Sequence, residues 1–225
     1  PKPMVFASLF PEDQDNFENL KIALSKLKLS DAALIFEPET KELLGRGFRC
    51  GFLGTLHAEI ISERLKREFN LNLIVSAPSV VYRVIDNKDK EIFIYSSSEW
   101  LEQGLVKESQ EPWVKLEIIT PPQYLGQVSE LLKKSGGKQI ETKYFSQEKL
   151  FLIWEAPLRE IISGFFDELK GASQGFASMN YEILGYRKAN LVKLEILMPA
   201  KKKKLFPGLC QKNWFLAKGR DWLKN

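Results

Sequence analysis

Few residues in this chain have the type and spacing that acid–base or metal chemistry requires. His57 is the only histidine among the 225 residues, so no pair of imidazoles can bind a metal ion or relay a proton. Cys50 and Cys210 lie far apart and form no CxxC motif, which disfavours a zinc site and a disulfide framework. No two carboxylates stand as an isolated pair against an apolar background. We therefore predict that the chain as given is not an enzyme and has no catalytic, cofactor-binding or metal-binding residues.

A glycine-rich stretch that leads into a helix is the feature most able to hold a phosphate group. It contains Gly45, Gly47, Gly51 and Gly54, and apolar residues at helical spacing follow over residues 55–69. The stretch lacks the GxxxxGK[ST] pattern, whose lysine and hydroxyl would contact phosphate and Mg²⁺, and this pattern occurs nowhere in the chain. We therefore expect these glycines to serve packing.

The same stretch predicts a strand followed by a helix. Phe48, Cys50 and Phe52 occupy alternate positions, which places them on one face of a strand. Glycines in a strand allow close approach of a neighbour, and Cys50 is expected to be a small core residue. His57 falls in the first turn of the helix, where we expect it to form a hydrogen bond that fixes the turn. The motif expected to be structural comprises Gly47, Phe48, Gly51, Phe52, Gly54 and His57.

Hydrophobic periodicity divides the chain into two units with the same order of elements. In the first unit, strands are expected at residues 5–10, 33–37, 48–52 and 73–84, helices at residues 17–27 and 55–69, and a loop at residues 38–47. In the second unit, strands are expected at residues 114–119, 139–145 and 150–154, helices at residues 121–132 and 157–169, and a last strand made by residues 181–183 and 192–198. Both units have the order β-α-β-β-α-β. The predicted fold class is therefore α+β, with two ferredoxin-like sandwich domains in tandem.

The expected domain boundaries follow from this order. Residues 1–85 form the first domain and residues 112–198 the second, and between them residues 86–111 form a charged connector whose apolar run at residues 92–95 could pair locally. Residue 1 lies almost at the first strand, so we expect the chain to start at a boundary inside a larger protein. No apolar stretch reaches the roughly 18 residues that span a membrane, and no signal peptide precedes the first strand.

Positive charge is concentrated at the end of the chain. The 33 basic and 29 acidic residues give a net charge of +4, whereas residues 199–225 hold eight Lys or Arg and one Asp, a net charge of +7. The remaining residues therefore carry −3, which disfavours a basic nucleic-acid-binding surface on the body. The tail includes Lys201, Lys202, Lys203 and Lys204, which could contact a phosphate backbone or anionic lipid. Such a block of like charges is also typical of a solvated, disordered end.

Four stretches of the sequence carry a family resemblance. RGFRCGFLGTLHAEIISERLKREFNL, at residues 46–71, resembles the third domain of the LepA family (elongation factor four), translational GTPases related to elongation factor G. The resemblance also includes residues 2–40, 111–132 and 162–183, and so extends over most of residues 2–198. The second unit resembles the family's fifth domain. Only about 25 residues separate the two units, which resembles LepA and not elongation factor G, where a large domain intervenes.

The resemblance implies the role of a longer parent protein. The family's GTP-binding domain and the following barrel are absent here, and residues 87–90 fail the guanine-reading NKxD pattern because Lys90 replaces its Asp. GTP and magnesium would therefore bind in the missing domain. The parent would bind ribosomes in its GTP form, hydrolyse GTP there, and influence tRNA–mRNA position, translational fidelity or ribosome assembly. The two units would relay signals, with the third domain facing the small subunit and the fifth facing large-subunit RNA.

The resemblance also implies partners and a location. The partners would be ribosomal RNA and ribosomal proteins of both subunits. The family's carboxyl-terminal domain would contact tRNA. The basic tail at residues 199–225 would be either the start of that domain or a disordered end. No small-molecule substrate is expected, and the fragment would be a monomer. The location would be cytoplasmic and ribosome-associated, and the family resemblance allows peripheral membrane association.

Candidate ribosome or RNA contacts come from a loop, a turn and the tail. Residues 171–175 match the family's SxxxGxA-like tip, with Gly171, Ser173, Gln174 and Gly175 as candidates, although a plain helix C-cap explains the glycines equally well. Arg187 and Lys188 follow in a later turn and could contact phosphate or be ordinary surface charge. Lys201, Lys202, Lys203 and Lys204 complete the set.

Two alternatives use the same fold class. An RNA recognition motif has the order β-α-β-β-α-β with stacking aromatics on its central strands, and Arg46, Gly47 and Phe48 begin a similar signature. Arg49 and Cys50 then break the match, because they replace a small residue and a second aromatic. An enzyme of acylphosphatase type would need a phosphate-holding loop after the first strand, where residues 11–13 place acidic side chains instead.

Overall fold

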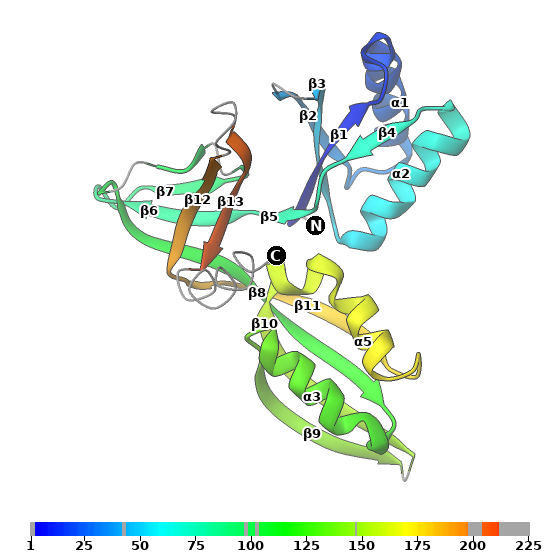
Figure 1. Cartoon of the computed structure of the whole chain (residues 1–225), viewed down its shortest axis with the longest axis vertical. Helices are drawn as coiled ribbons and strands as arrows, with labels where there is room; N and C mark the ends of the chain where they lie inside the picture. Colours follow the sequence, from blue (N-terminus) through cyan, green and yellow to red (C-terminus); the bar gives the residue numbers. More distant parts are fainter. Residues whose placement is uncertain are drawn as a thin grey trace.

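The computed structural model describes residues 3–41, 44–96, 99–101, 104–146, 148–197 and 204–211, with side chains described up to residue 192. The strands form three sheets of five, six and two strands (Figure 1). The two larger sheets each carry helices, which confirms an α+β chain with two ferredoxin-like units.

The first unit has the strand order of a ferredoxin-like sheet. Its elements are β1 (Val5–Pro11), η1 (Gln14–Asn16), α1 (Phe17–Ser30), β2 (Ile35–Lys41), β3 (Gly45–Phe52), α2 (Thr55–Phe69) and β4 (Leu73–Val75). The order across the sheet is β2-β3-β1-β4, all neighbours are antiparallel, and β5 (Ser79–Val80) pairs with β1 beside β4. Leu20 and Leu24 of α1 and Leu65 of α2 are fully buried against one face of this sheet. The expected helix at residues 55–69 is confirmed to the residue.

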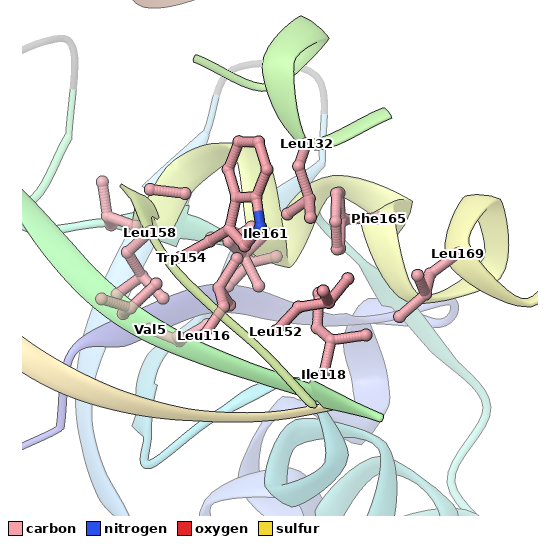
Figure 2. Close-up of a cluster of buried hydrophobic side chains, with 14 of the residues drawn as sticks. Val5, Leu116, Ile118, Leu132, Leu152, Trp154, Leu158, Ile161, Phe165 and Leu169 are labelled. Carbon is pink, nitrogen blue, oxygen red and sulfur yellow. The ribbon is translucent and has the colours of Figure 1, made fainter. Parts of the chain in front are cut away.

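The second unit repeats this arrangement. Its elements are β8 (Val106–Thr120), η3 (Pro122–Tyr124), α3 (Leu125–Lys134), β9 (Lys138–Ser146), β10 (Lys149–Pro157), α4 (Leu158–Glu160), η4 (Ile161–Phe165), α5 (Phe166–Ala172) and β11 (Ser178–Lys188). The order β11-β8-β10-β9 is again ferredoxin-like. Figure 2 shows Trp154 and Leu152 of β10 packed in one cluster with Leu132 of α3 and Phe165 of η4, and all four are at most 2% exposed.

The segments between the two units differ from the sequence prediction. The single strand expected at residues 73–84 is wrong, because Pro78 interrupts it and three short strands form: β4, β5 and β6 (Tyr82–Asp86). β6 belongs to the second sheet, where it pairs with β7 (Glu91–Ile94) and β8. The local pairing expected near residues 92–95 is thus confirmed by β7. The loop expected at residues 38–47 is shorter, because β2 continues to Lys41 at the sheet edge, where Pro38 is tolerated.

The last strand of the second unit also differs. β11 alone completes the sheet, so the assignment of residues 192–198 to that strand is wrong. The amide of Ala189 donates to the carbonyl of Ser109 (2.9 Å), and that of Leu191 to the Ser109 hydroxyl (3.4 Å), which anchors the turn out of β11. The chain continues as β12 (Leu191–Leu197), which pairs with β13 (Lys204–Gln211) in a separate sheet. Met198 lies outside the described residues.

The helix expected at residues 157–169 is broken. Gly164 has a φ of 90°, in the left-handed region that favours glycine, and Ser163 has a ψ of 42°. The Ser163 hydroxyl donates to the carbonyl of Arg159 (2.7 Å), which competes with the regular helical ladder. Because of the break, Phe166 is 47% exposed instead of joining the apolar stripe, whereas Phe165 is buried.

The two units are packed together through a common group of buried side chains. Val5 of β1 and Val80 of β5 belong to the same buried cluster as Leu116 and Leu158 of the second unit, and Figure 2 draws Val5 among them. Figure 1 shows β5 lying between the two helical layers near the start of the chain. The first unit therefore contributes directly to the core of the second.

Candidate functional site

The glycine-rich strand β3 is built for packing on both of its faces. Phe48 and Phe52 share the buried face toward the helices, where the ring of Phe48 stacks on Phe17 with centroids 4.9 Å apart. On the other face, a Cβ on Gly47 would lie 2.4 Å from the Phe10 ring, and one on Gly51 would lie 2.9 Å from the Phe6 ring. The glycines leave room for neighbouring side chains, including aromatic rings of β1, in agreement with the packing role expected from the sequence.

This arrangement removes the RNA-recognition alternative. A stacking platform needs exposed aromatics on the central strands, yet Phe48 is 1% exposed and faces the helices. Phe6, on the open face of the sheet, is covered by Tyr95 at 5.1 Å in an edge-on arrangement. Arg49 occupies the same face and donates to Glu99 (2.7 Å) and Glu37 (3.1 Å). The open face of the first sheet therefore has no free aromatic platform among the residues described.

His57 fixes the start of α2, which confirms the expected hydrogen bond. Its Nδ1 accepts from the amide of Leu53 (3.1 Å), so Nε2 carries the proton and donates to Asp31 (2.8 Å). Burial of Asp31 would raise its pKa, but hydrogen bonds from Ala33 and His57 outweigh that effect and hold the pKa below its ordinary value. The histidine thus ties α2 to the end of α1.

Gly54 brings the structural motif into contact with the second unit. A Cβ on Gly54 would lie 2.6 Å from the hydroxyl oxygen of Tyr181 in β11. Partial burial raises the pKa of Tyr181. Gly54 is also the residue that precedes α2, and its lack of a side chain permits the contact between units.

The tip loop at residues 171–175 ends α5 in a Schellman-type cap. The amide of Gly175 donates to the carbonyl of Lys170 (2.7 Å), and the amide of Gln174 to that of Gly171 (3.3 Å). Ser173 is fully buried, and its hydroxyl donates to the carbonyl of Leu169 (2.7 Å) and accepts from the amide of Ala177 (2.9 Å). The structure therefore points Ser173 inward and leaves Gly171, Gln174 and Gly175 exposed.

Arg187 and Lys188 both have acidic partners. Arg187 donates to Glu155 (2.7 Å) and lies 4.7 Å from the ring centroid of Trp113. The hydrogen bond from Arg187 lowers the pKa of Glu155. Lys188 lies 3.2 Å from Glu108 but its side chain is 77% exposed. Lys188 is therefore more accessible to a phosphate than Arg187. Of the tail lysines, Lys204 begins β13, and Lys201, Lys202 and Lys203 lie outside the described residues.

Three strongly exposed aromatic residues were missed by the sequence analysis. Tyr144 is 77% exposed, Phe145 80% and Phe176 65%. Phe176 stacks on Tyr124 with centroids 6.0 Å apart, and the Tyr124 hydroxyl donates to Gln174 (3.0 Å). Alternation along β9 gave no sign that two neighbouring rings would both be exposed, because β9 is the edge strand of the sheet and its pairing with β10 has a bulge at Phe145.

Within the described part of the chain, no three His, Cys, Asp or Glu side chains are grouped so as to hold a metal ion. No helix in that part is long and apolar enough to cross a membrane.

Known proteins share both units. The family model described as Elongation Factor G, domain III matches residues 1–77, and the model described as Elongation factor G C-terminus matches residues 108–197. The chain is 52% identical over 197 residues to Elongation factor 4 of Thermosynechococcus vestitus, covering 88% of the chain and 33% of the relative. It is 45% identical over 224 residues to Elongation factor 4 of Sulfurimonas denitrificans, covering 100% of the chain and 38% of the relative. The chain belongs to the elongation factor 4 family.

A further relative and a solved structure are also similar to this chain. The Translation factor GUF1 homolog of Arabidopsis thaliana, described as chloroplastic, is 49% identical over 198 residues, covering 88% of the chain and 29% of the relative. The chain thus spans about a third of the length of these elongation factor 4 relatives. A crystal structure of a Thermus thermophilus protein matches 84% of the chain and 41% of its own length with a TM-score of 0.53 at 16% identity, which supports the fold alone.

Proposed function

We propose that this chain is a ribosome-binding, signal-relaying part of an elongation factor 4 type translation factor. The observation that carries the proposal is the presence of both ferredoxin-like units of that family in one packed body, with exposed groups at the end of the second unit. The parent is proposed to act on translocation, translational fidelity or ribosome assembly. GTP and Mg²⁺ would bind in a separate domain of the parent, since neither family model matched here is a nucleotide-binding domain.

The proposed division of labour follows the two units. A domain at residues 1–85 would face the small subunit, and a domain at residues 112–198 would face large-subunit RNA and protein. The connector at residues 86–111 would join them, because β7 pairs with β6 of the second sheet while Tyr95 packs on Phe6 and Glu99 accepts a hydrogen bond from Arg49 of the first unit. Burial of Val5 and Val80 in the cluster of the second unit supports transmission of a displacement from one unit to the other.

The proposed contacts are ranked by accessibility. Gln174 and Gly175 at the tip and the exposed Lys188 are the foremost candidates, and Arg187 is secondary because Glu155 already holds it. The tail, including Lys201 to Lys204, would add salt-sensitive contacts to phosphate, or to anionic lipid in peripheral membrane association. Contact with tRNA would fall to the family's carboxyl-terminal domain, and the fragment is proposed to be a monomer located with ribosomes in the cytoplasm.

Ribosome co-sedimentation over a salt series tests this function. We expect the whole chain to bind ribosomes weakly. The logarithm of the association constant should fall as the logarithm of the salt concentration rises, because phosphates bound by Lys or Arg release counterions. Removing residues 199–225 should reduce the slope, and Lys188→Ala should lower it further by roughly 0.9 if that phosphate lies in a duplex. Absence of any ribosome binding at low salt would contradict the proposal.

A further inference from the structure

The end of the β9–β10 hairpin exposes two neighbouring aromatic rings. Successive residues of a regular strand point to opposite faces. Here the pairing passes from Ser146 with Lys149 to Tyr144 with Leu150, so Phe145 is an extra residue without a partner on β10. β9 is the edge strand of the sheet and none of its residues is buried, and both rings near its bulged end are strongly exposed, Tyr144 by 77% and Phe145 by 80%. Burial does not explain these side chains.

This hairpin end lies at the same end of the second unit as the tip loop. Leu150 of β10 pairs with Thr120 at the end of β8, and Ile119 pairs with Ser178 at the start of β11. Figure 1 shows the β9–β10 turn and the chain between α5 and β11 at one end of the sheet. Three strand spacings of about 4.8 Å separate β9 from β11. Tyr144 and Phe145 at the end of β9 are therefore roughly 14 Å from the stacked pair of Phe176 and Tyr124 near the start of β11. They can contact one extended partner.

The surroundings of the two rings are polar and partly basic. Ser146, Glu148 and Lys149 follow them, and within the described residues Lys149 is exposed with no acidic partner in hydrogen-bonding range. Lys143 is paired with Glu141 (2.8 Å). The two rings offer flat surfaces on which the bases of a single-stranded nucleic acid can stack, and Lys149 offers a positive charge for an adjacent phosphate.

We propose that Tyr144 and Phe145 form a stacking platform for unpaired RNA bases, with Lys149 contacting an adjacent phosphate. This inference rests on the proposed ribosomal role, because it gives the second unit a defined class of RNA target: bases splayed from a loop or bulge. Recognition by stacking tolerates any base, since every base has a π-face. The platform is separate from the open face of the first sheet, whose aromatics are covered.

The test uses the full chain and a short single-stranded RNA that contains 2-aminopurine, an adenine analogue whose fluorescence is quenched by stacking. The wild-type chain should quench this fluorescence and bind the single strand more tightly than a paired duplex of equal length. Tyr144→Leu and Phe145→Leu keep apolar bulk but remove the rings, so each should raise Kd by roughly 5-fold or more and reduce quenching. The salt slope should stay unchanged in both variants, because neither removes a charge.

Two controls separate stacking from charge and from misfolding. Lys149→Ala should retain quenching but lower the salt slope by roughly 0.7, the value for one phosphate contact on a single strand. Phe93→Leu removes a ring of β7 that is 45% exposed, and it should leave RNA binding unchanged. Unchanged quenching in the double variant Tyr144→Leu/Phe145→Leu, or an equal loss of duplex and single-strand binding in that variant, would overturn the platform.

Ribosome co-sedimentation of the same variants keeps this inference distinct from the proposed function. Ring-dependent quenching by a chain that never pellets with ribosomes would support the platform and refute the ribosomal role. Ribosome binding that persists in the double variant, together with no ring-dependent quenching, would refute the platform and leave the ribosomal role standing.

Discussion

The contact between Gly54 and Tyr181 gives the most direct test of how the two units are joined. Gly54→Ala adds a methyl group 2.6 Å from the Tyr181 hydroxyl oxygen, a separation that real Cβ atoms do not adopt. The next nearest atom of that tyrosine is 3.7 Å away, at ordinary van der Waals distance. The clash therefore depends almost entirely on one oxygen atom, and Tyr181→Phe should relieve it.

The expected magnitude follows from these distances. The clash is with the end of one half-buried side chain, which can shift, so the overpacking cost should be near the low end of the usual range, about 1 kcal/mol, and alanine before a helix is less favourable than glycine by some tenths of a kcal/mol. We expect Gly54→Ala to lower the free energy of unfolding by about 1–1.5 kcal/mol. The double variant Gly54→Ala/Tyr181→Phe should recover most of the overpacking part, giving a coupling energy of about 0.5–1 kcal/mol.

Urea unfolding of the wild type, Gly54→Ala, Tyr181→Phe and the double variant measures the coupling energy. Gly126→Ala is a matched control, because Gly126 lies in α3 and a methyl group added there would have no neighbouring atom within 4 Å. That change should stabilise the chain slightly, by about 0.5–1 kcal/mol, because alanine is the better helix former. Independent effects of Gly54→Ala and Tyr181→Phe would refute the idea that this glycine is required by the contact between units.

Three further predictions concern the first unit and ligand binding. Gly47→Ala should destabilise the chain by about 3 kcal/mol in the same urea assay, because its Cβ would lie 2.4 Å from the Phe10 ring and 2.5 Å from a backbone carbonyl. The pKa of Asp31 is lowered in the folded state, so its contribution is present above its unfolded pKa of about 3.9 and is lost as pH falls through the folded value. The stability difference between the wild type and Asp31→Asn should therefore shrink on acidification from pH about 5 to pH about 2, and a constant difference would contradict this. Isothermal titration with GTP and Mg²⁺ should show no saturable heat, because the chain lacks the phosphate cradle pattern.

The order of elements could be predicted because it depends on local periodicity. The change from alternate spacing around Phe48 to helical spacing after Gly54 placed the boundary between β3 and α2 correctly. Each unit then contained enough strands and helices to specify the ferredoxin-like order. His57 could also be assigned a structural role, because a lone histidine in a first helical turn has a backbone partner close in sequence.

The features that escaped prediction depend on pairing between distant residues. The bulge at Phe145 exists only in the register between β9 and β10, which single-strand alternation cannot specify. Membership of β6 in the second sheet likewise depends on β8, more than twenty residues away. The break at Gly164 had a local signal, since an internal helical glycine can adopt a positive φ, but the strong apolar stripe around it favoured a continuous helix.

The shared core has a consequence for any relay between the two units. Val5 and Val80 come from strands of the first sheet, are at most 1% exposed, and pack in the cluster of the second unit. Burial of one such side chain contributes about 1.5–3 kcal/mol, but part of it is kept within the first sheet, where Val5 pairs with Phe52 and Val80. About 3–6 kcal/mol is therefore the upper bound on what these two side chains lose when the units separate, and the joined state is favoured. A force at the tip of the second unit should therefore displace the first unit with it. In the parent protein, the two units should move as one body relative to the other domains.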